Sequence, residues 1–157
     1  MEPYERKVWI RDEVDIAVAR LVGREMADEL PFDQVARYCI VTSVSELASN
    51  VYFHVGTGAV DMRIIARGDG VKGMEVVATD AGPGIENIDL ALQDGFSTHG
   101  TLGGGLPGVR RLMSELTVDS VAGEGTVVRA VKWVDDHTRA FAQGSAFQGS
   151  NGERRLE

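Results

Sequence analysis

Three glycines, Gly103, Gly105 and Gly108, match the pattern G-x-G-x-x-G inside the segment HGTLGGGLPGVRR. In dinucleotide-binding proteins this pattern joins a strand directly to a helix in a βαβ unit, with the pyrophosphate at the helix N-terminus. Here the glycines follow a long polar segment, residues 80–105, and the strand-like runs on either side come in hairpin pairs. The sequence therefore argues against a doubly wound parallel sheet. A P-loop is set aside too, because no Gly-Lys-Ser/Thr follows the glycines.

The spacing of apolar residues predicts the first two helices and five strands. Apolar side chains recur at helical intervals from Val14 to Met26 and from Ile40 to Val55. Asp12 and Asp33 stand where N-caps of these two helices are expected. Alternating or continuous apolar runs predict strands over residues 6–11, 60–67, 74–80, 116–121 and 126–134.

Turn-rich segments group the strands into pairs. GDGVKG separates the second and third strands and AGEG separates the last two, so each pair is predicted to form an antiparallel hairpin. Residues 87–92 indicate one short helical piece within the long polar segment. Pro107 suits the first turn of a third helix. The apolar residues of this helix are spaced at i, i+3, i+4 and i+7: Val109, Leu112, Met113 and Leu116.

Size and charge narrow the class of protein. The 157 residues, 43% of them hydrophobic, are typical of one globular domain. A formal net charge of −8 argues against binding nucleic acid or an anionic membrane through bulk electrostatics. The single cysteine, Cys39, lies in an apolar stretch and is interpreted as a small buried side chain. Without a signal-peptide pattern or an apolar run of about 18 residues, the protein is expected in the cytoplasm.

The regular pattern of helices and strands decays near the end of the chain. Residues 1–134 are expected to form the domain. Residues 135–157, which include AFAQGSAFQGSNGERRLE, are predicted to form a C-terminal tail that is partly disordered.

Glu46 and Asn50 form the first candidate site pair. They lie four residues apart in SELASN, so both project from one side of the second helix, about a third of a turn from its apolar stripe. Such a pair suits a metal ion and a reacting hydroxyl group. Taken alone, the pair is better explained as the solvated polar face of an amphipathic helix.

Asp80 and the glycines after it form a second candidate. In DAGPGI, Asp80 ends a strand, and Gly82 and Gly84 allow the backbone to turn tightly and approach a flat ligand. An ionised Asp80 suits an exocyclic amine, and Thr126, which begins the last strand in GEGT, can support the same ligand. Taken singly, Asp80 and its glycines are an ordinary turn, and Thr126 is a residue of good strand propensity.

Taken together and in this order, the motifs favour a functional site over the simpler structural explanations of each one. Glu46 to Asn50, Asp80-Ala-Gly-Pro-Gly, the run Gly103-Gly104-Gly105-Leu106 and Gly123-Glu-Gly-Thr126 resemble the N box and the three glycine-containing boxes of the GHKL ATPase and kinase superfamily. The resemblance covers residues 6–134, and four ordered motifs are far more specific than any one of them. Within the superfamily, SELASN and GGGLPGVRRLMSEL are similar to the anti-sigma-factor type of serine/threonine kinase, above all to stressosome switch kinases.

This resemblance implies the fold and the ligands. The fold is α+β, a two-layer α/β sandwich of the Bergerat type, with a mixed, mainly antiparallel sheet and helices on one face. ATP binds between the helices and a loop. Asn50 coordinates Mg²⁺, and Glu46 orients or deprotonates the attacking serine or threonine hydroxyl.

The remaining site residues are assigned from the same resemblance. Asp80 reads the adenine amino group, in a pocket shaped by Gly82, Gly84 and Thr126. The backbone N–H groups of Gly103, Gly104, Gly105 and Leu106, with the start of the third helix, hold the phosphates.

Three functions remain open at this stage. The resemblance favours an ATP-dependent kinase of a bacterial stress-response partner switch, which phosphorylates STAS-domain stressosome proteins and, when released, activates a PP2C-type phosphatase. The alternative is an anti-sigma factor that sequesters a sigma factor and phosphorylates its antagonist. A histidine kinase is disfavoured, because no helix pair with a phosphoacceptor histidine precedes the domain in this sequence.

Overall fold

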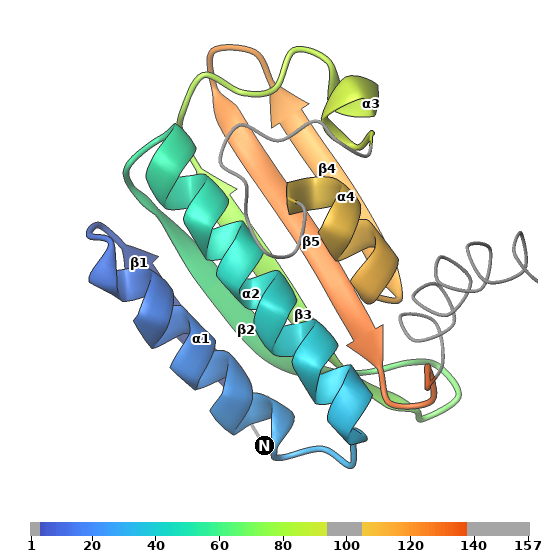
Figure 1. The fold of residues 1–157 in the computed structure, drawn as a ribbon. Coiled ribbons are helices and arrows are strands. Elements are labelled where there is room, and N and C mark those ends of the chain that lie inside the picture. Colours follow the sequence, from blue (N-terminus) through green and yellow to red (C-terminus); the bar gives the residue numbers. More distant parts are fainter. Residues whose placement is uncertain (1–3, 94–104, 138–157) are drawn as a thin grey trace, which may run out of the picture.

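The computed structural model describes residues 4–93 and 105–137. Gly103, Gly104 and residues 138–157 of the predicted tail therefore lie outside the described residues. The elements follow the chain in this order: β1 (Glu5–Ile10), α1 (Val14–Ala27), α2 (Gln34–His54), β2 (Gly58–Ala66), β3 (Lys72–Asp80), α3 (Ile88–Ala91), α4 (Gly105–Leu112), β4 (Glu115–Val121) and β5 (Gly125–Trp133) (Figure 1).

The strands form a five-stranded sheet in the order β1-β2-β3-β5-β4. Both predicted hairpins are present, β2 with β3 and β4 with β5. All four strand pairs in the described part of the chain are antiparallel. The sheet is therefore antiparallel, not mixed. Because β3 pairs with β5, the register brings Asp80 opposite Thr126, although 46 positions separate them in the sequence.

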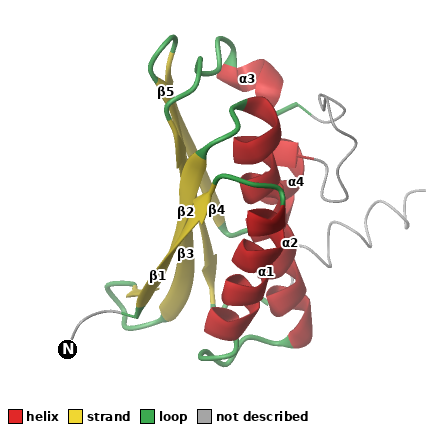
Figure 2. Cartoon of the chain, turned by 90° about the vertical axis from the view of Figure 1, so that its left-hand side faces the viewer, coloured by secondary structure: helices red, strands yellow, loops and turns green. Residues whose placement is uncertain are grey.

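Helices α1, α2 and α4 cover one face of this sheet and leave the other face open (Figure 2). The predicted α+β sandwich with helices on one face is thus confirmed. Its core lies between the layers, where Ile40 and Val44 of α2 and Met62 and Val76 of the sheet have no exposed surface. Burying side chains of this size stabilises the fold by about 1.5–3 kcal/mol each.

The two predicted helix N-caps fare differently. Asp33 caps α2, and its Oδ1 accepts a hydrogen bond from Ala36 N at 2.7 Å. Asp12 is not the cap of α1, because the cap position is Glu13, which makes no side-chain capping bond. Instead, the carboxylate of Asp15 in the first turn accepts hydrogen bonds from Arg11 N and Asp12 N. Asp15 thus satisfies the amides that precede the helix.

The third helix is shorter than its apolar spacing predicts. α4 ends at Leu112, and Leu116 belongs to β4, so its assignment to the helix is wrong. The chain leaves the helix because Ser114 N donates a hydrogen bond to Val131 O at 2.8 Å, which starts the pairing of β4 with β5. Leu116 still packs against the core, from the inner face of the strand.

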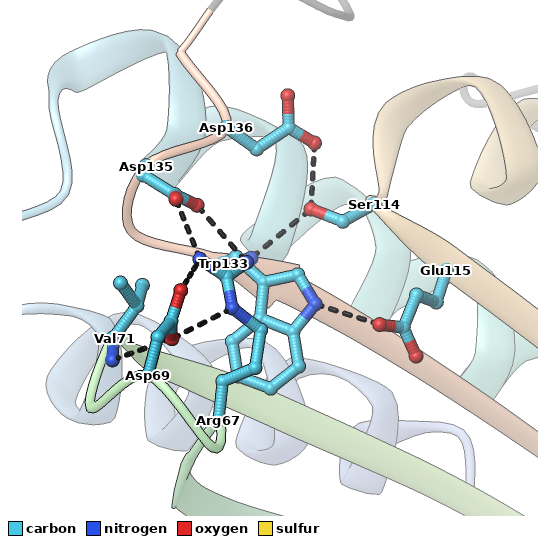
Figure 3. Close-up of polar contacts among 8 residues, drawn as sticks. All are labelled: Arg67, Asp69, Val71, Ser114, Glu115, Trp133, Asp135 and Asp136. Carbon is cyan, nitrogen blue, oxygen red and sulfur yellow. Dashed lines mark hydrogen bonds and ion pairs between the residues drawn. The ribbon is translucent and has the colours of Figure 1, made fainter.

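The described chain continues three residues past Val134, and each of them contacts the domain. His137 Nδ1 lies 3.5 Å from Asp33 Oδ2. Asp135 Oδ2 pairs with Arg67 Nη2 at 2.7 Å, and Asp136 accepts a hydrogen bond from Ser114 Oγ at 2.6 Å (Figure 3). Among the residues that the structure describes, no helix is long and apolar enough to cross a membrane.

Candidate functional site

The candidate site residues of the strands and turns, Asp80, Gly82, Gly84 and Thr126, lie at one end of the sheet. β3 and β4 end there, β5 begins there, and the C-terminal part of α2 lies beside them (Figure 1). The topology therefore brings together segments that are far apart in the sequence.

Glu46 and Asn50 project from α2 beside α4. Glu46 is only 3% exposed, and its Oε1 accepts a hydrogen bond from Gly105 N at 3.1 Å. The interpretation of Glu46 as part of a solvated helix face is thus wrong. A buried carboxylate needs compensating partners, and the Gly105 amide at the N-terminal end of α4 is one of them. Asn50, one turn further along α2, is half-buried.

Asp80 lies at the last position of β3. Its Oδ1 accepts a hydrogen bond from Gly82 N at 2.9 Å, which fixes the carboxylate at the start of the turn. The second carboxylate oxygen, Oδ2, has no hydrogen bond to another described residue, and Asp80 as a whole is half-buried. A carboxylate held in this way is a rigid acceptor for an amino group.

Gly82 and Gly84 are both required as glycines in this turn. A Cβ at position 82 would lie 2.5 Å from Val55 Cγ2 at the end of α2. Gly84 has a φ of +80°, and a Cβ there would lie 2.6 Å from the carbonyl oxygen of Val121. The turn after β3 therefore packs directly on α2 and on the end of β4, as the glycines predict.

Thr126 is 7% exposed and lies opposite Asp80 on the neighbouring strand. Its hydroxyl is 2.9 Å from Ser120 Oγ. Ser120 Oγ also accepts a hydrogen bond from Ile85 N at 2.7 Å and lies 3.1 Å from Gly125 O. Ser120 therefore ties the turn after Asp80 to the β4–β5 hairpin.

The sequence interpretation missed Ser120. A signal was present, since Leu116, Val118 and Ser120 alternate on the inner face of β4, and a polar residue at an inward position needs a partner.

Of the glycine run, Gly105 and Leu106 are described. Gly105 has a φ of +70°, and its amide is the group that donates to Glu46. The Leu106 side chain is buried in the core, so its part in the predicted phosphate site would fall to its backbone amide. This end of α4 thus contacts the helix that carries Glu46 and Asn50.

The donor set at this site fits a magnesium nucleotide. Mg²⁺ typically takes one or two protein oxygen ligands and completes its coordination with phosphates and water. The half-buried amide of Asn50 suits this role, and within residues 4–93 and 105–137 no group of three His, Cys, Asp or Glu forms a separate metal site. Cys39 is fully buried, and burial raises the pKa of its thiol, so it is an apolar side chain of the core, not a nucleophile.

Comparison with known proteins agrees with this geometry. The family described as "Histidine kinase-like ATPase domain" matches residues 9–132, and the chain belongs to this family. The chain is 49% identical over 127 residues to the serine/threonine-protein kinase RsbT of Bacillus subtilis (strain 168), an alignment that covers 81% of this chain and 95% of RsbT. The enzyme class is therefore that of an ATP-using serine/threonine-protein kinase.

Two further relatives are more distant. The anti-sigma F factor of Thermoanaerobacter sp. (strain X514) is 34% identical over 101 residues, which cover 60% of this chain and 68% of that protein. The crystal structure of the RsbU and RsbW domains of Rv1364c from Mycobacterium tuberculosis is 19% identical, with a TM-score of 0.56. The match covers 84% of this chain and 32% of that structure, and it supports the fold alone.

Proposed function

We propose that this kinase acts in a bacterial stress-response partner switch in the cytoplasm. It transfers the γ-phosphoryl group of ATP to a serine or threonine of STAS-domain stressosome proteins. On release from that complex it binds and activates a PP2C-type phosphatase. The alignment with RsbT over nearly the whole length of that protein supports this proposal.

The observation that carries the mechanism is the buried contact of Glu46 Oε1 with Gly105 N. This contact joins α2, which carries the candidate base Glu46 and the candidate metal ligand Asn50, to α4, whose N-terminus is proposed to hold the phosphates. Glu46 accepts the proton of the attacking hydroxyl, and Asn50 holds Mg²⁺. Bound Mg²⁺-ATP supplies the phosphoryl group and the charge compensation around it.

The nucleotide itself is bound at the two glycine-containing turns. Asp80 accepts a hydrogen bond from the adenine amino group, and Gly82, Gly84 and Thr126 shape that pocket. The amides of residues 103–106, namely Gly103, Gly104, Gly105 and Leu106, bind the phosphates, and the Gly105 amide does so by exchanging its bond to Glu46 Oε1 for one to a phosphate oxygen. We assign the kinase domain to residues 1–134 and the tail to 135–157.

Glu46→Gln tests this assignment. Glutamine keeps a carbonyl oxygen for Gly105 N but cannot take a proton, so phosphoryl transfer to a purified STAS partner should fall at least about 100-fold. ATP affinity should stay within about threefold of the wild type, because the Gly105 contact survives. Glu29→Gln, an exposed residue after α1, is the matched control and should leave both values unchanged. Undiminished transfer by Glu46→Gln would remove Glu46 from the mechanism.

The second candidate function is that of an anti-sigma factor. The 34% identity to an anti-sigma F factor favours it. In this case, sequestration of a sigma factor is the output, and the antagonist of that factor is the phosphorylated protein. Purified candidates separate the two functions: binding of a sigma factor supports the alternative, and binding of a STAS protein and a PP2C-type phosphatase supports the first.

A further inference from the structure

Lys132 is a buried charge on the inner face of the sheet. It lies in β5 and is only 1% exposed, among the largest fully buried side chains of the described chain. Burying an ammonium group without partners is strongly unfavourable, so the contacts of the Lys132 ammonium must compensate for its burial. Two are present: Nζ donates a hydrogen bond to Leu112 O at 2.8 Å and lies 3.6 Å from Asp136 Oδ2.

The first contact places the ammonium at the C-terminal end of α4. Leu112 is the last residue of this helix, where backbone carbonyl groups lack partners within the helix. A cation there satisfies a carbonyl oxygen and interacts favourably with the helix dipole. Lys132 thus acts as a C-terminal cap supplied by a strand of the sheet.

The second contact is held by the chain just after β5. Ser114 Oγ donates to Asp136 Oδ2 at 2.6 Å and accepts from Trp133 N at 3.0 Å (Figure 3). Asp135, next to it, pairs with Arg67, whose guanidinium lies 5.1 Å from the centre of the Trp133 ring. Asp136, the counterion of Lys132, lies beyond the residues matched by the family, 9–132, and is held by its hydrogen bond from Ser114.

Helix α4 consequently has a polar anchor at each end. Glu46 binds Gly105 N at its start, and Lys132 binds Leu112 O at its end. The eight residues of α4 span only about 12 Å, so a shift at one end displaces the other. The apolar contacts of Val109 and Met113 are non-directional, whereas hydrogen bonds set the position of the helix along its axis.

We propose that Lys132, with Asp136 as its counterion, is a positioning residue for the nucleotide site. It holds α4 from its C-terminal end, so that the N-terminal amides keep the position needed to bind the ATP phosphates. This inference rests on the proposed role of those amides. It follows that ATP affinity depends on Lys132, which contacts the C-terminal end of α4, whereas the phosphates bind at the N-terminal end.

Lys132→Met tests the inference directly. Methionine keeps most of the length and the apolar stem but leaves Leu112 O without its donor. ATP affinity, measured by calorimetry with Mg²⁺, should fall about tenfold, as expected for the loss of one charged hydrogen bond. Amide exchange of Gly105 and Leu106 in the nucleotide-free protein should become faster. Lys132→Arg should restore much of both values.

Matched variants separate positioning from general stability. Lys72→Met makes the same change at an exposed position of β3 and should alter neither the ATP affinity nor the amide exchange rates. Asp136→Asn should weaken ATP binding in the same direction as Lys132→Met, whereas Asp135→Asn should not. If Lys132→Met fails to fold, Asp136→Asn still tests the inference.

The outcomes of this experiment distinguish the inference from the proposed function. Wild-type protein that binds no ATP would count against the proposed function, while the exchange rates would still report on the anchoring of α4. Wild-type binding with unchanged affinity and exchange in folded Lys132→Met and Asp136→Asn would overturn the inference alone.

Discussion

At the scale of single residues, Glu75 shows how the open face of the sheet is stabilised. Glu75 is 5% exposed, and its carboxylate lies between two arginines, with Arg63 Nη2 2.8 Å from Oε1 and Arg129 Nε bound to Oε2. Burial alone raises the pKa of Glu75, but the hydrogen bonds from Arg129 and Arg63 and the charges of both together lower it by more. The net pKa therefore lies below its usual range.

A lowered carboxyl pKa has a definite consequence for stability. Stabilisation by Glu75 is fully present above its unfolded pKa of about 4.3 and is lost as the pH falls through its lower folded pKa. Glu75→Gln should therefore reduce the free energy of unfolding at pH 7 by about 2 kcal/mol. The difference from the wild type should shrink below about pH 4, measured by urea unfolding across the pH range.

The exposed residue Glu29 gives the control for this prediction. Glu29→Gln should leave the stability unchanged at every pH. A Glu75→Gln variant as stable as the wild type at pH 7 would mean that the two arginines contribute nothing through this carboxylate.

Residue types and spacing were enough to select the candidate site but not its supporting contacts. Glu46 was identified by its spacing from Asn50, and Asp80 and Thr126 by the glycines next to them, because together these residues form ordered motifs. Ser120 and Lys132 were not, because each acts through a partner whose position depends on the fold. Ser120 meets Ile85 N across a turn, and Lys132 meets the end of a helix.

At the scale of elements, α2 is the helix that carries Glu46 and Asn50, and its N-cap is a local determinant of its stability. Asp33→Ala removes the hydrogen bond to Ala36 N and should lower the free energy of unfolding by about 1 kcal/mol. The His137 contact with Asp33 is exposed and adds little. Glu13→Ala, at the cap position of α1 without a side-chain bond, should have no measurable effect. Equal losses in the two variants, measured by chemical unfolding, would contradict this assignment of the caps.

The elements were predictable where their signals are local. The long helix after Asp33 and both hairpins were predicted, because apolar period and turn residues act over a few positions. The pairing of β3 with β5 was not, since it depends on contacts between residues about 50 positions apart. The end of α4 was also missed, because strand pairing at Ser114 overrides a helical spacing that continues to Leu116.

At the scale of the whole molecule, the sheet order creates the site. β5 lies between β3 and β4, so the Asp80 turn and the Thr126 hairpin meet at one end of the sheet, beside the C-terminal part of α2 (Figure 1). If the strands followed their sequence order, β4 would lie between β3 and β5 and would separate Asp80 from Thr126. We propose that these segments form one composite nucleotide site, in which Asp80 is the residue that selects adenine.

The most direct test of this claim is calorimetry with ATP, ADP and NAD⁺, each with and without Mg²⁺, on the wild type, Asp80→Asn and Asp119→Asn. Asp119 is exposed on the open face of β4 and serves as the control. We expect binding of adenine nucleotides only, strengthened for ATP by Mg²⁺ and weakened at least about tenfold by Asp80→Asn, as for a lost charged hydrogen bond. A folded wild-type protein that binds no nucleotide, or an Asp80→Asn variant that binds ATP as tightly as the wild type, would contradict it.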